Sequence, residues 1–385
     1  MYPRLLYVGD VPVEASYHGS ALLHRLLSDY PPKKLTIIET ATQSETSRRL
    51  PQVNYLSCPI GNQRWLNTRF HPYVFAWFTQ AGKRSAPKIT QSLNGFAFES
   101  VLTVAHGFGW LAAAEIAERR NVPLHLIVHD DWPRVADVAP AFRNLLDKRF
   151  ANVYRQAQSR LCVSPAMSRS YGKRYRKPAQ TIYPSRAATC AQYDEPPARL
   201  ARNDHAFTIA FAGTINSTGY IRALAALQEA LKPIGGRLLI FGPTTSAEAH
   251  QFGLNVADVR GLVSSSELIA NLRNEADALF VPMSFDPADR INMEMAFPSK
   301  LADYTATGLP LLIYGPTYCS AVTWARENAG VAMVVNFEPN LREAIALLAN
   351  NPDTRIALGR RALTVGREYF THDRAREQFY KTLSA

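Results

Sequence analysis

Residues 298–314 read PSKLADYTATGLPLLIY, and the short apolar run ALFVP precedes them at 278–282. Pro298 and Ser299 suit the N-terminus of a helix, and Gly308 suits its C-terminal end. The apolar runs on either side have the length and composition of buried strands. The stretch therefore predicts a strand–helix–strand unit of a parallel sheet.

The same alternation of short apolar runs and helical patterns continues along the whole chain, which is typical of βαβ units. The first series of expected strands lies near 4–9, 35–39, 53–57, 101–105, 124–128, 160–163 and 180–183. The second series lies near 207–212, 237–241, 256–260, 278–282, 311–314 and 332–335. The segments 220–231 and 265–276 carry apolar residues at the three-and-four spacing of amphipathic helices. The expected fold class is α/β, with two doubly wound, Rossmann-like domains facing each other across a cleft.

A chain of 385 residues is long enough for two domains. The apolar pattern stops between residues 184 and 204, where charges and two consecutive prolines replace it. We therefore expect an N-terminal domain over 1–185, a linker over 186–204 and a C-terminal domain over 205–367. The final stretch, 352–383, contains two further helical patterns.

The sequence has 43 Lys and Arg against 32 Asp and Glu, a net charge of +11 that favours an anionic partner or substrate. Its four cysteines (Cys58, Cys162, Cys190 and Cys319) are scattered and form no CxxC pair, so no zinc site is expected from them. No apolar run approaches the ~18–20 residues of a membrane span, and the N-terminus lacks a signal-peptide pattern. The expected location is the cytoplasm.

Two histidines and two acidic residues end expected strands of the first half. His106 ends SVLTVAH and His129 ends PLHLIVH, so both should lie at the same edge of the sheet. There they could hydrogen-bond substrate hydroxyls or carry protons near neutral pH. Asp130 and Asp131 resemble a metal-binding pair, but no second acidic cluster has a suitable spacing, and we expect an N-cap instead.

Small residues follow several other expected strands. Gly19 and Ser20 lead into a helix whose free backbone N–H groups could meet an anion or a hydroxyl, although spacing alone favours an ordinary N-cap with a flexible glycine. The loops of the second half have the same two interpretations, phosphate contact or capping. Their candidate binding residues are Gly213, Thr214, Asn216, Gly242, Pro243, Leu262 and Val263. The last two could offer backbone groups to a nucleobase edge.

Ser299 and Lys300 place a hydroxyl, backbone donors and a cation at the positive end of the expected helix, directly after Pro298. A cation at a helix N-terminus is unfavourable unless an anion accompanies it, so this position favours a diphosphate ligand. Asp303, one turn further along the helix, could accept hydrogen bonds from a sugar diol.

Over nearly all of its length the sequence resembles the GT-B glycosyltransferases, most closely those of the retaining family 4 type. The resemblance is best in the second half, where FPSKLADYTATGLPLLIYGP is similar to the family's PSKLxEYLAxGxP signature. In the first half, AHGFGWLAAAEIAERRNVPLHLIVHDD is similar to the family's paired strands with a histidine near the reacting sugar. The resemblance also implies that a terminal helix, about 368–385, crosses back onto the first domain.

The resemblance implies roles for the candidate residues, and two positions depart from it. The implied roles are ribose binding by Asp303, phosphate contact by Ser299 and Lys300, donor-phosphate contact by Gly19 and Ser20, and a place near the reacting sugar for His106 and His129. Thr214 stands where the family has an arginine, and INSTGY, which follows, holds no lysine. Met295 fills the place of the family's first glutamate. Either Lys300 neutralises the diphosphate, helped by Arg222 or Arg290, or donor binding is weakened.

These observations predict a hexosyltransferase-type glycosyltransferase (EC 2.4 class) of polysaccharide or glycoconjugate biosynthesis. It would move a sugar from a nucleotide-diphosphate sugar, bound by the second domain, to an acceptor hydroxyl on a glycan, lipid-linked or small molecule held by the first. The expected catalytic residues are His106, His129 and Lys300. Retention follows from the resemblance alone, and neither a metal nor a cofactor is expected. The alternatives are a non-catalytic GT-B scaffold or partner subunit, which Thr214 favours, and a nucleotide-sugar epimerase.

Aromatic and basic residues mix between positions 64 and 84, which read RWLNTRFHPYVFAWFTQAGKR. Such mixing suits peripheral contact with the inner face of a membrane or with a lipid-linked acceptor. A core helix with a solvated basic rim explains the same pattern. Nucleic-acid binding is not expected, because no recognition motif accompanies the positive charge.

Overall fold

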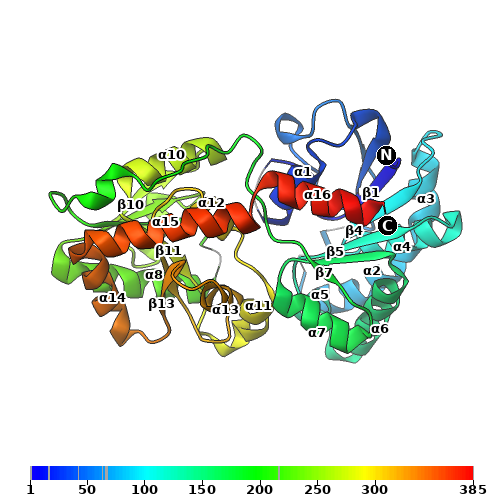
Figure 1. Ribbon diagram of the computed structural model, residues 1–385. Helices are drawn as coiled ribbons and strands as arrows, with labels where there is room; N and C mark the ends of the chain where they lie inside the picture. The colour runs from blue at the N-terminus through cyan, green and yellow to red at the C-terminus, as the bar shows by residue number, and fades with distance from the viewer. Residues whose placement is uncertain are drawn as a thin grey trace. The chain divides into compact units, whose positions relative to one another are not determined.

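A parallel sheet of seven strands organises the first of the two units into which the chain divides (Figure 1). Unit 1 contains residues 1–183 and 373–385, and unit 2 contains residues 184–372. The computed structural model describes residues 2–15, 18–41, 43–62, 64–65, 68–215 and 217–384. Each unit has its own sheet and its own buried apolar core.

The sheet of unit 1 has the strand order β3-β2-β1-β4-β5-β6-β7, and every pair in it is parallel. Its strands are β1 (Leu5–Gly9), β2 (Leu35–Glu39), β3 (Asn54–Ser57), β4 (Ser100–Val104), β5 (Leu124–Val128), β6 (Ser159–Cys162) and β7 (Gln180–Thr181). All residues of β1, β2, β4 and β5 are buried. Full burial requires cover on both faces of the sheet, which is why these strands are continuous apolar runs rather than alternating ones.

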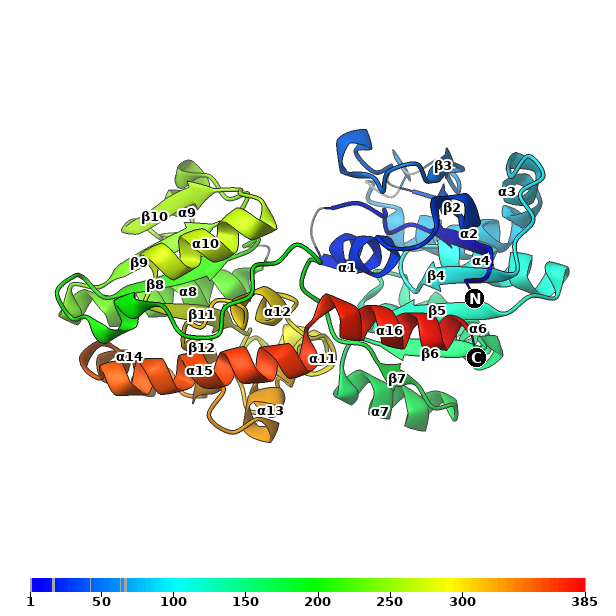
Figure 2. The same ribbon diagram turned by 45° about the horizontal axis from the view of Figure 1, so that its top comes forward.

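The α-helices of unit 1 are α1 (His18–Leu27), α2 (His71–Arg84), α3 (Ala86–Ser92), α4 (Gly109–Arg120), α5 (Trp132–Val135), α6 (Pro140–Gln156), α7 (Pro165–Tyr175) and nearly all of α16 (His372–Leu383). Short 3-10 turns lie at Pro32–Lys34 and Thr46–Arg48. The C-terminal α16 lies beside α1 (Figures 1 and 2), where Arg376 pairs with Asp29 and Tyr380 contacts the rings of Tyr2 and Tyr30. Among the described residues, no helix combines the length and apolar character that crossing a bilayer requires.

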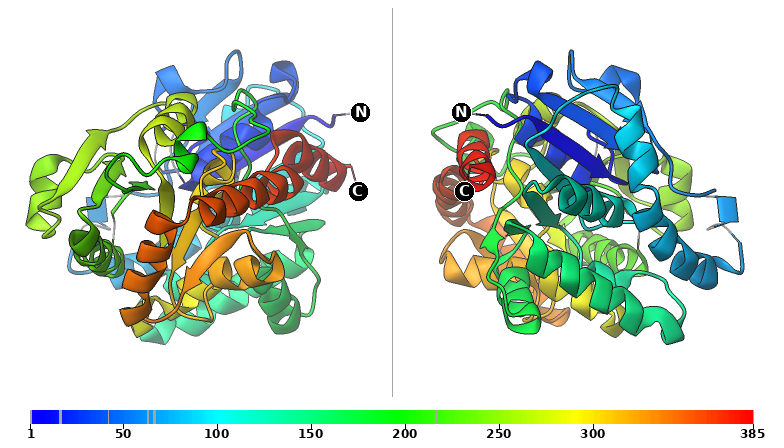
Figure 3. Two further views of the ribbon diagram at one scale, coloured as in Figure 1. Left: turned by 60° about the vertical axis from the view of Figure 1, so that its left-hand side comes forward. Right: turned by 90° about the vertical axis from the view of Figure 1, so that its right-hand side faces the viewer.

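The sheet of unit 2 has six parallel strands in the order β10-β9-β8-β11-β12-β13. Its strands are β8 (Thr208–Ala212), β9 (Arg237–Phe241), β10 (Ala257–Gly261), β11 (Ala278–Pro282), β12 (Leu311–Tyr314) and β13 (Ala332–Val335). Its α-helices are α8 (Thr218–Leu231), α9 (Ser246–Gln251), α10 (Ser265–Glu275), α11 (Arg290–Met295), α12 (Lys300–Tyr304), α13 (Ser320–Glu327), α14 (Pro339–Asn350) and α15 (Pro352–Tyr369). Further 3-10 turns lie at Ala198–Ala201, Lys232–Ile234 and Pro287–Asp289. Helix α15 packs against β12 and β13 (Figure 3, left).

The α/β class predicted from the sequence is confirmed, and each expected strand is present within two residues of its predicted bounds. In both sheets the strand order reverses once, between β1 and β4 in unit 1 and between β8 and β11 in unit 2. Loops leave the sheet in opposite directions at such a switch point, so the carboxyl ends of these strands are where open α/β sheets bind ligands.

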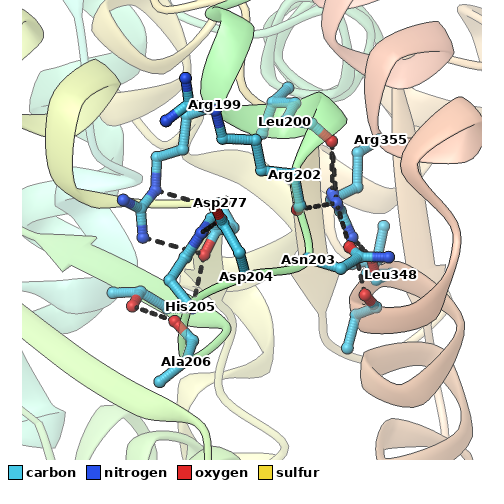
Figure 4. A network of polar contacts seen from close by, with 12 residues as sticks. Arg199, Leu200, Arg202, Asn203, Asp204, His205, Ala206, Asp277, Leu348 and Arg355 are labelled. Carbon is cyan, nitrogen blue, oxygen red and sulfur yellow. Dashed lines mark hydrogen bonds and ion pairs between the residues drawn. The ribbon is translucent and has the colours of Figure 1, made fainter.

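A buried arginine fastens the beginning of unit 2 to its last long helix (Figure 4). Arg355 lies on α15 with 1% of its surface exposed. Its guanidinium donates hydrogen bonds to the carbonyl oxygens of Leu200, Arg202, Leu348 and Ala349 and to the side chain of Asn203. Residues 198–203 therefore belong to the packed body of unit 2.

A buried carboxylate extends this network to the sheet (Figure 4). Asp277 directly precedes β11 and accepts hydrogen bonds from the backbone N–H of Thr208 at 2.8 Å and from Arg199 Nε at 2.9 Å. The His205 ring lies 2.9 Å from the same carboxylate. Together these contacts fix the chain where it enters β8.

We expect Arg355→Met to lower the free energy of unfolding by about 3 kcal/mol or more, because several buried carbonyl oxygens lose their donor at ~1–3 kcal/mol each. Urea titration followed by circular dichroism measures this loss. Arg360→Met is the matched control, since Arg360 lies on the same helix and makes an exposed ion pair with Glu195. Such pairs contribute ~0–1 kcal/mol. Equal losses in the two variants would contradict the assignment.

Candidate functional site

Two histidines of unit 1 lie side by side at the carboxyl ends of β4 and β5, next to the switch point of its sheet. β4 and β5 pair in parallel with Val104 opposite Ile127, and the same register carried forward places His106 next to His129. The two rings have centroids 5.4 Å apart in an edge-to-face arrangement. As the sequence predicts, both histidines therefore lie at one edge of the sheet.

Asp130 and Trp132 complete this group. One carboxylate oxygen of Asp130 lies 3.3 Å from Nε2 of His129 and 3.9 Å from Nδ1 of His106. The Trp132 ring lies against the other side of His106, with centroids 4.4 Å apart. Burial, and to a smaller extent the neighbouring His129, lower the pKa of His106 to about 4, while Asp130 opposes the change. His106 is therefore neutral at neutral pH and can both donate and accept hydrogen bonds.

Gly19 and Ser20 lie in the first turn of α1, and Gly19 touches the same group. A Cβ atom on Gly19 would collide with the imidazole of His129. Glycine at this position thus allows the backbone to approach the ring. Ser20 is buried. The structure therefore brings Gly19, His106 and His129 together.

Asp10 is a candidate residue that the sequence analysis missed. It follows β1, is buried, and accepts hydrogen bonds from the backbone N–H groups of Phe108 at 2.6 Å and Gly109 at 3.0 Å, and from the Thr40 hydroxyl. Burial raises the pKa of Asp10, and these hydrogen bonds oppose the increase. Because the bonds hold the turn that follows His106, Asp10 positions that histidine. The hydrogen-bond partners of Asp10 are remote in sequence. A carboxylate at the end of an expected strand was therefore the one local signal that could have identified Asp10.

The expected capping role of Asp131 is wrong. Asp131 occupies the N-cap position of α5, but its side chain accepts no hydrogen bond from the helix. The carboxylate is fully buried and accepts a 2.7 Å hydrogen bond from the hydroxyl of Tyr171, with Arg134 and Arg174 at 3.4 and 3.6 Å. Partners on α7 therefore determine its position, and local sequence does not reveal them.

Lys300 is the first residue of α12 in unit 2, and its ammonium lies in an unusual environment. Nζ is 4.0 Å from the ring centroid of Phe211, which belongs to β8, and 5.2 Å from that of Tyr220 on α8. No carboxylate of a described residue pairs with it. Burial lowers the pKa of Lys300 to about 7. Ser299 is the N-cap residue of α12, but its hydroxyl makes no capping hydrogen bond.

Two glycines follow neighbouring strands at this end of the sheet, and one of them lies beside the Lys300 ammonium. Gly213 follows β8 with φ +143°, and a Cβ atom there would lie 3.4 Å from the Lys300 Nζ. Gly242 follows β9 with φ +153°, and a Cβ atom there would collide with the carbonyl oxygen of Gly213. Both positions favour glycine because of conformation and close approach. The ammonium therefore lies close to the backbone that follows β8.

The other predicted residues of unit 2 are spread around this group. Thr214, Val263, Pro298 and Asp303 are half-buried, whereas Pro243, Leu262 and Ser299 are exposed. Asn216 lies outside the described residues. No hydrogen bond or ring contact joins Leu262 or Val263 to Lys300 in the described part of the chain. Asp303 is electrostatically coupled to Arg186, which donates to the Ala302 carbonyl on the same helix.

The two arginines expected to help Lys300 have partners of their own. Arg222 lies 3.7 Å from Asp286, and Arg290 stacks 4.6 Å over the ring of Tyr318. In contrast, the aromatic walls formed by Phe211 and Tyr220 were not predicted. A signal was available in Tyr220, which directly follows the small-residue loop that the sequence analysis singled out.

Comparison with known proteins finds similar structures, whereas comparison of the sequence finds no match. No model of a protein family matches the sequence, and no curated protein matches it. HepE from Anabaena, solved with UDP and glucose, matches with a TM-score of 0.70 over 100% of both chains at 12% identity. The GT-B glycosyltransferase fold of this neighbour spans both units. The chain has the GT-B fold.

Two further GT-B proteins match at similar levels. Sucrose-phosphate synthase from Thermosynechococcus elongatus has a TM-score of 0.66 at 13% identity, covering 98% of this chain and 97% of its own. WaaG, a glycosyltransferase involved in lipopolysaccharide biosynthesis, has a TM-score of 0.63 at 14% identity, covering 97% and 99%. The predicted GT-B fold class is confirmed.

We expect Lys300→Met to raise the melting temperature of the ligand-free protein, with the largest gain at or below pH 7. In the unfolded chain Lys300 has its ordinary, higher pKa, so the folded state carries the full cost of a buried charge below pH 7. That cost disappears as the pH rises from 7 towards 10.5, and the gain should shrink with it. Differential scanning calorimetry between pH 6 and pH 9.5 measures the trend.

Lys232→Met is the control for this measurement, because the Lys232 ammonium is exposed and pairs with Glu229. Its melting temperature should follow that of the unchanged protein at every pH. A gain for Lys300→Met that is independent of pH, or that grows with pH, would rule out a desolvated ammonium.

Proposed function

We propose that this protein is a glycosyltransferase that moves a sugar from a nucleotide-diphosphate sugar to an acceptor hydroxyl, with unit 2 binding the donor. The observation that carries the proposal is the unpaired, half-buried ammonium of Lys300 at the switch point of the second sheet. Burying a cation without a counter-ion is costly, and natural proteins keep such groups where a ligand supplies the missing charge. HepE, a neighbour of the same fold, was solved with UDP and with UDP-glucose.

The ligand that fits this group is a diphosphate. The ammonium of Lys300 supplies a positive charge, and the absence of a Cβ atom on Gly213 keeps the space beside it clear for a phosphate oxygen. As the bond from the anomeric carbon to the diphosphate oxygen breaks, negative charge grows on that oxygen. Lys300 stabilises this charge from a fixed position, which lowers the barrier. The acceptor hydroxyl loses its proton to the departing phosphate, so the step requires no carboxylate base.

Two further assignments belong to this proposal. Asp303, on the same helix as Lys300, accepts hydrogen bonds from the ribose hydroxyls. The backbone beside Leu262 and Val263 contacts the nucleobase. In unit 1, His106 and His129 hydrogen-bond the hydroxyls of the transferred sugar or of the acceptor. The neutral state of His106 supports this role, because a neutral imidazole both donates and accepts.

Transfer without a metal on the diphosphate is also proposed, with retention of configuration resting on the sequence resemblance. In the described residues of unit 2, no three His, Cys, Asp or Glu side chains gather closely enough to hold an ion. A lysine and helix-end N–H groups can neutralise a diphosphate in place of a metal. The reaction class is hexosyl transfer (EC 2.4), with no cofactor beyond the donor itself.

We expect one of UDP, GDP, ADP and TDP to raise the melting temperature, because a ligand that binds the folded state alone stabilises it, by ~2.7 kcal/mol at one hundred times its Kd. Lys300→Met should abolish the shift, and Lys232→Met should keep it. The same pair of variants should lose and keep turnover of the matching nucleotide sugar, followed as release of the nucleoside diphosphate. If none of the four nucleotides stabilises the unchanged protein, the proposal fails and the non-catalytic scaffold alternative replaces it.

A contact with anionic membrane surfaces, where a lipid-linked acceptor would be met, is the second part of the proposal. Phe70, Tyr73 and Trp77, here named the aromatic face, are 50%, 64% and 59% exposed. Their spacing along α2 places them on one side of the helix, while Phe75 and Phe78 on the other side are buried. Exposed aromatic rings with nearby cations are typical of membrane-interface helices.

The distribution of charge supports this contact. Unit 1 has 27 Lys and Arg against 14 Asp and Glu, whereas unit 2 has 16 against 18. The whole excess of positive charge therefore belongs to the unit that carries the aromatic face. Arg69 stacks on Phe70 of that face, and the exposed cations Arg64 and Arg84 lie close to it in the sequence. An anionic surface attracts such a unit over a Debye length of ~10 Å.

We expect the protein to sediment with vesicles that contain anionic lipids, and salt to weaken this binding. Replacing Tyr73 and Trp77 together by serine should reduce it by about tenfold or more, because two buried aromatic rings are lost. Phe337→Ser is the matched control, since Phe337 is 63% exposed but belongs to unit 2. Equal binding by the double variant and the unchanged protein would show that the aromatic face does not take part.

A further inference from the structure

We propose that His106, His129 and Asp130 form a binding site for one divalent transition-metal ion, with Zn²⁺ as the best-fitting ion. Among the described residues, these three are the one group of three or more His, Cys, Asp or Glu whose ligand atoms all lie within 4.8 Å of one another. They come from the ends of two neighbouring parallel strands, β4 and β5. The backbone of a buried sheet therefore holds the set in place.

The distances agree with a shared ion. In a tetrahedral zinc site, bonds of ~2.0–2.2 Å place ligand atoms ~3.3–3.5 Å apart. The Asp130 oxygen lies 3.3 Å from Nε2 of His129 and 3.9 Å from Nδ1 of His106. All three ligand atoms lie within 4.8 Å of one another, so an ion would have to draw the His106 ring closer.

The two histidine nitrogens of this set lack a hydrogen-bond partner among the described residues. Nδ1 of His106 and Nε2 of His129 are both buried, and neither makes a hydrogen bond with a described residue. A buried polar atom without a partner is costly, and native structures rarely contain one unless a water or an ion completes it. Two such atoms aimed at one carboxylate oxygen point to a cation between them.

The chemistry of the set selects the ion. Imidazole nitrogen suits Zn²⁺, Cu²⁺, Ni²⁺ and Co²⁺, whereas Mg²⁺ and Ca²⁺ prefer sites built from oxygen alone. Two histidines and one carboxylate supply three ligands, which leaves the fourth position of a zinc site open to water or to a hydroxyl. The sequence offers no acidic partner for Asp130 because its partners are two histidines, the adjacent His129 and His106, which follows another strand.

Neighbouring residues hold the ligands from behind. The Gly19 backbone lies against the His129 ring, near Nδ1, which leaves Nε2 directed towards Asp130. Trp132 packs on the ring of His106, and Asp10 holds the turn that follows it. Supports of this kind fix ligand orientation, and their loss commonly weakens metal binding by ~10–100-fold.

One consequence rests on the proposed function. That function gives the two histidines hydrogen bonds to sugar hydroxyls, and a bound ion would occupy the same nitrogens. Zn²⁺ should therefore inhibit sugar transfer, and a chelator should reverse the inhibition. Metal binding itself is measured without any nucleotide, so the two proposals fail separately.

The test titrates the full chain, freed of metal by a chelator, with Zn²⁺ in a calorimeter and with Co²⁺ in a spectrophotometer. We expect one ion per chain and visible absorption typical of Co²⁺ bound to nitrogen. His106→Ala, His129→Ala and Asp130→Asn should each weaken binding by about tenfold or more. Circular dichroism and the melting temperature in chelator establish that each variant is folded.

His71→Ala is the matched control, because His71 pairs with Asp137 on the surface of the same unit but has no second histidine beside it. It should bind Zn²⁺ as tightly as the unchanged protein. Asp130→Glu, which keeps a carboxylate, serves as a second variant and should retain more affinity than Asp130→Asn. Absence of stoichiometric binding, or a loss in His71→Ala equal to that in His106→Ala, would overturn the site.

Discussion

The desolvated ammonium of Lys300 is the constraint that shapes the candidate binding site of unit 2. Two aromatic rings and glycine backbone surround it, and this environment lowers its pKa to about 7. A fold that minimised its energy without a ligand would place a neutral side chain here. Local destabilisation of this kind is common where a protein is shaped for a charged ligand. The wholly buried central strands of the parallel sheet stabilise the fold and offset the cost of desolvating this charge.

Unit 1 has a counterpart of opposite sign at the same point of its own sheet. Asp10 follows β1 as Gly213 follows β8, and it is buried with two backbone N–H groups and a hydroxyl as partners. Here the charge serves the protein itself, because it joins the end of β1 to the turn after β4. A buried charge can thus either bind a ligand or hold a loop in place. The two cases differ in whether groups of the protein itself form hydrogen bonds with the charge.

The sequence revealed the strands because burial on both faces leaves a local trace, an uninterrupted apolar run such as Leu5–Gly9. It also located His106, His129 and Lys300, because strand ends and helix starts are local features. Asp131 was misassigned to capping because its partners Tyr171 and Arg174 lie some 40 residues away along the chain. Contacts of that kind are created by the sheet order, and a single sequence carries no signal of them.

The net charge of +11 suggested an anionic ligand for the protein as a whole. Because the excess charge belongs to unit 1 alone, this argument does not apply to unit 2. Unit 2, with the diphosphate candidate, has slightly more acidic than basic residues, so long-range attraction cannot hold a nucleotide there. In the proposed function, recognition of the diphosphate rests on one cation in a poorly solvated place, where Coulomb attraction is strongest. The excess charge of unit 1 acts over longer distances and suits a broad anionic surface. The proposed capture of the diphosphate and the proposed attraction to such a surface therefore belong to separate units.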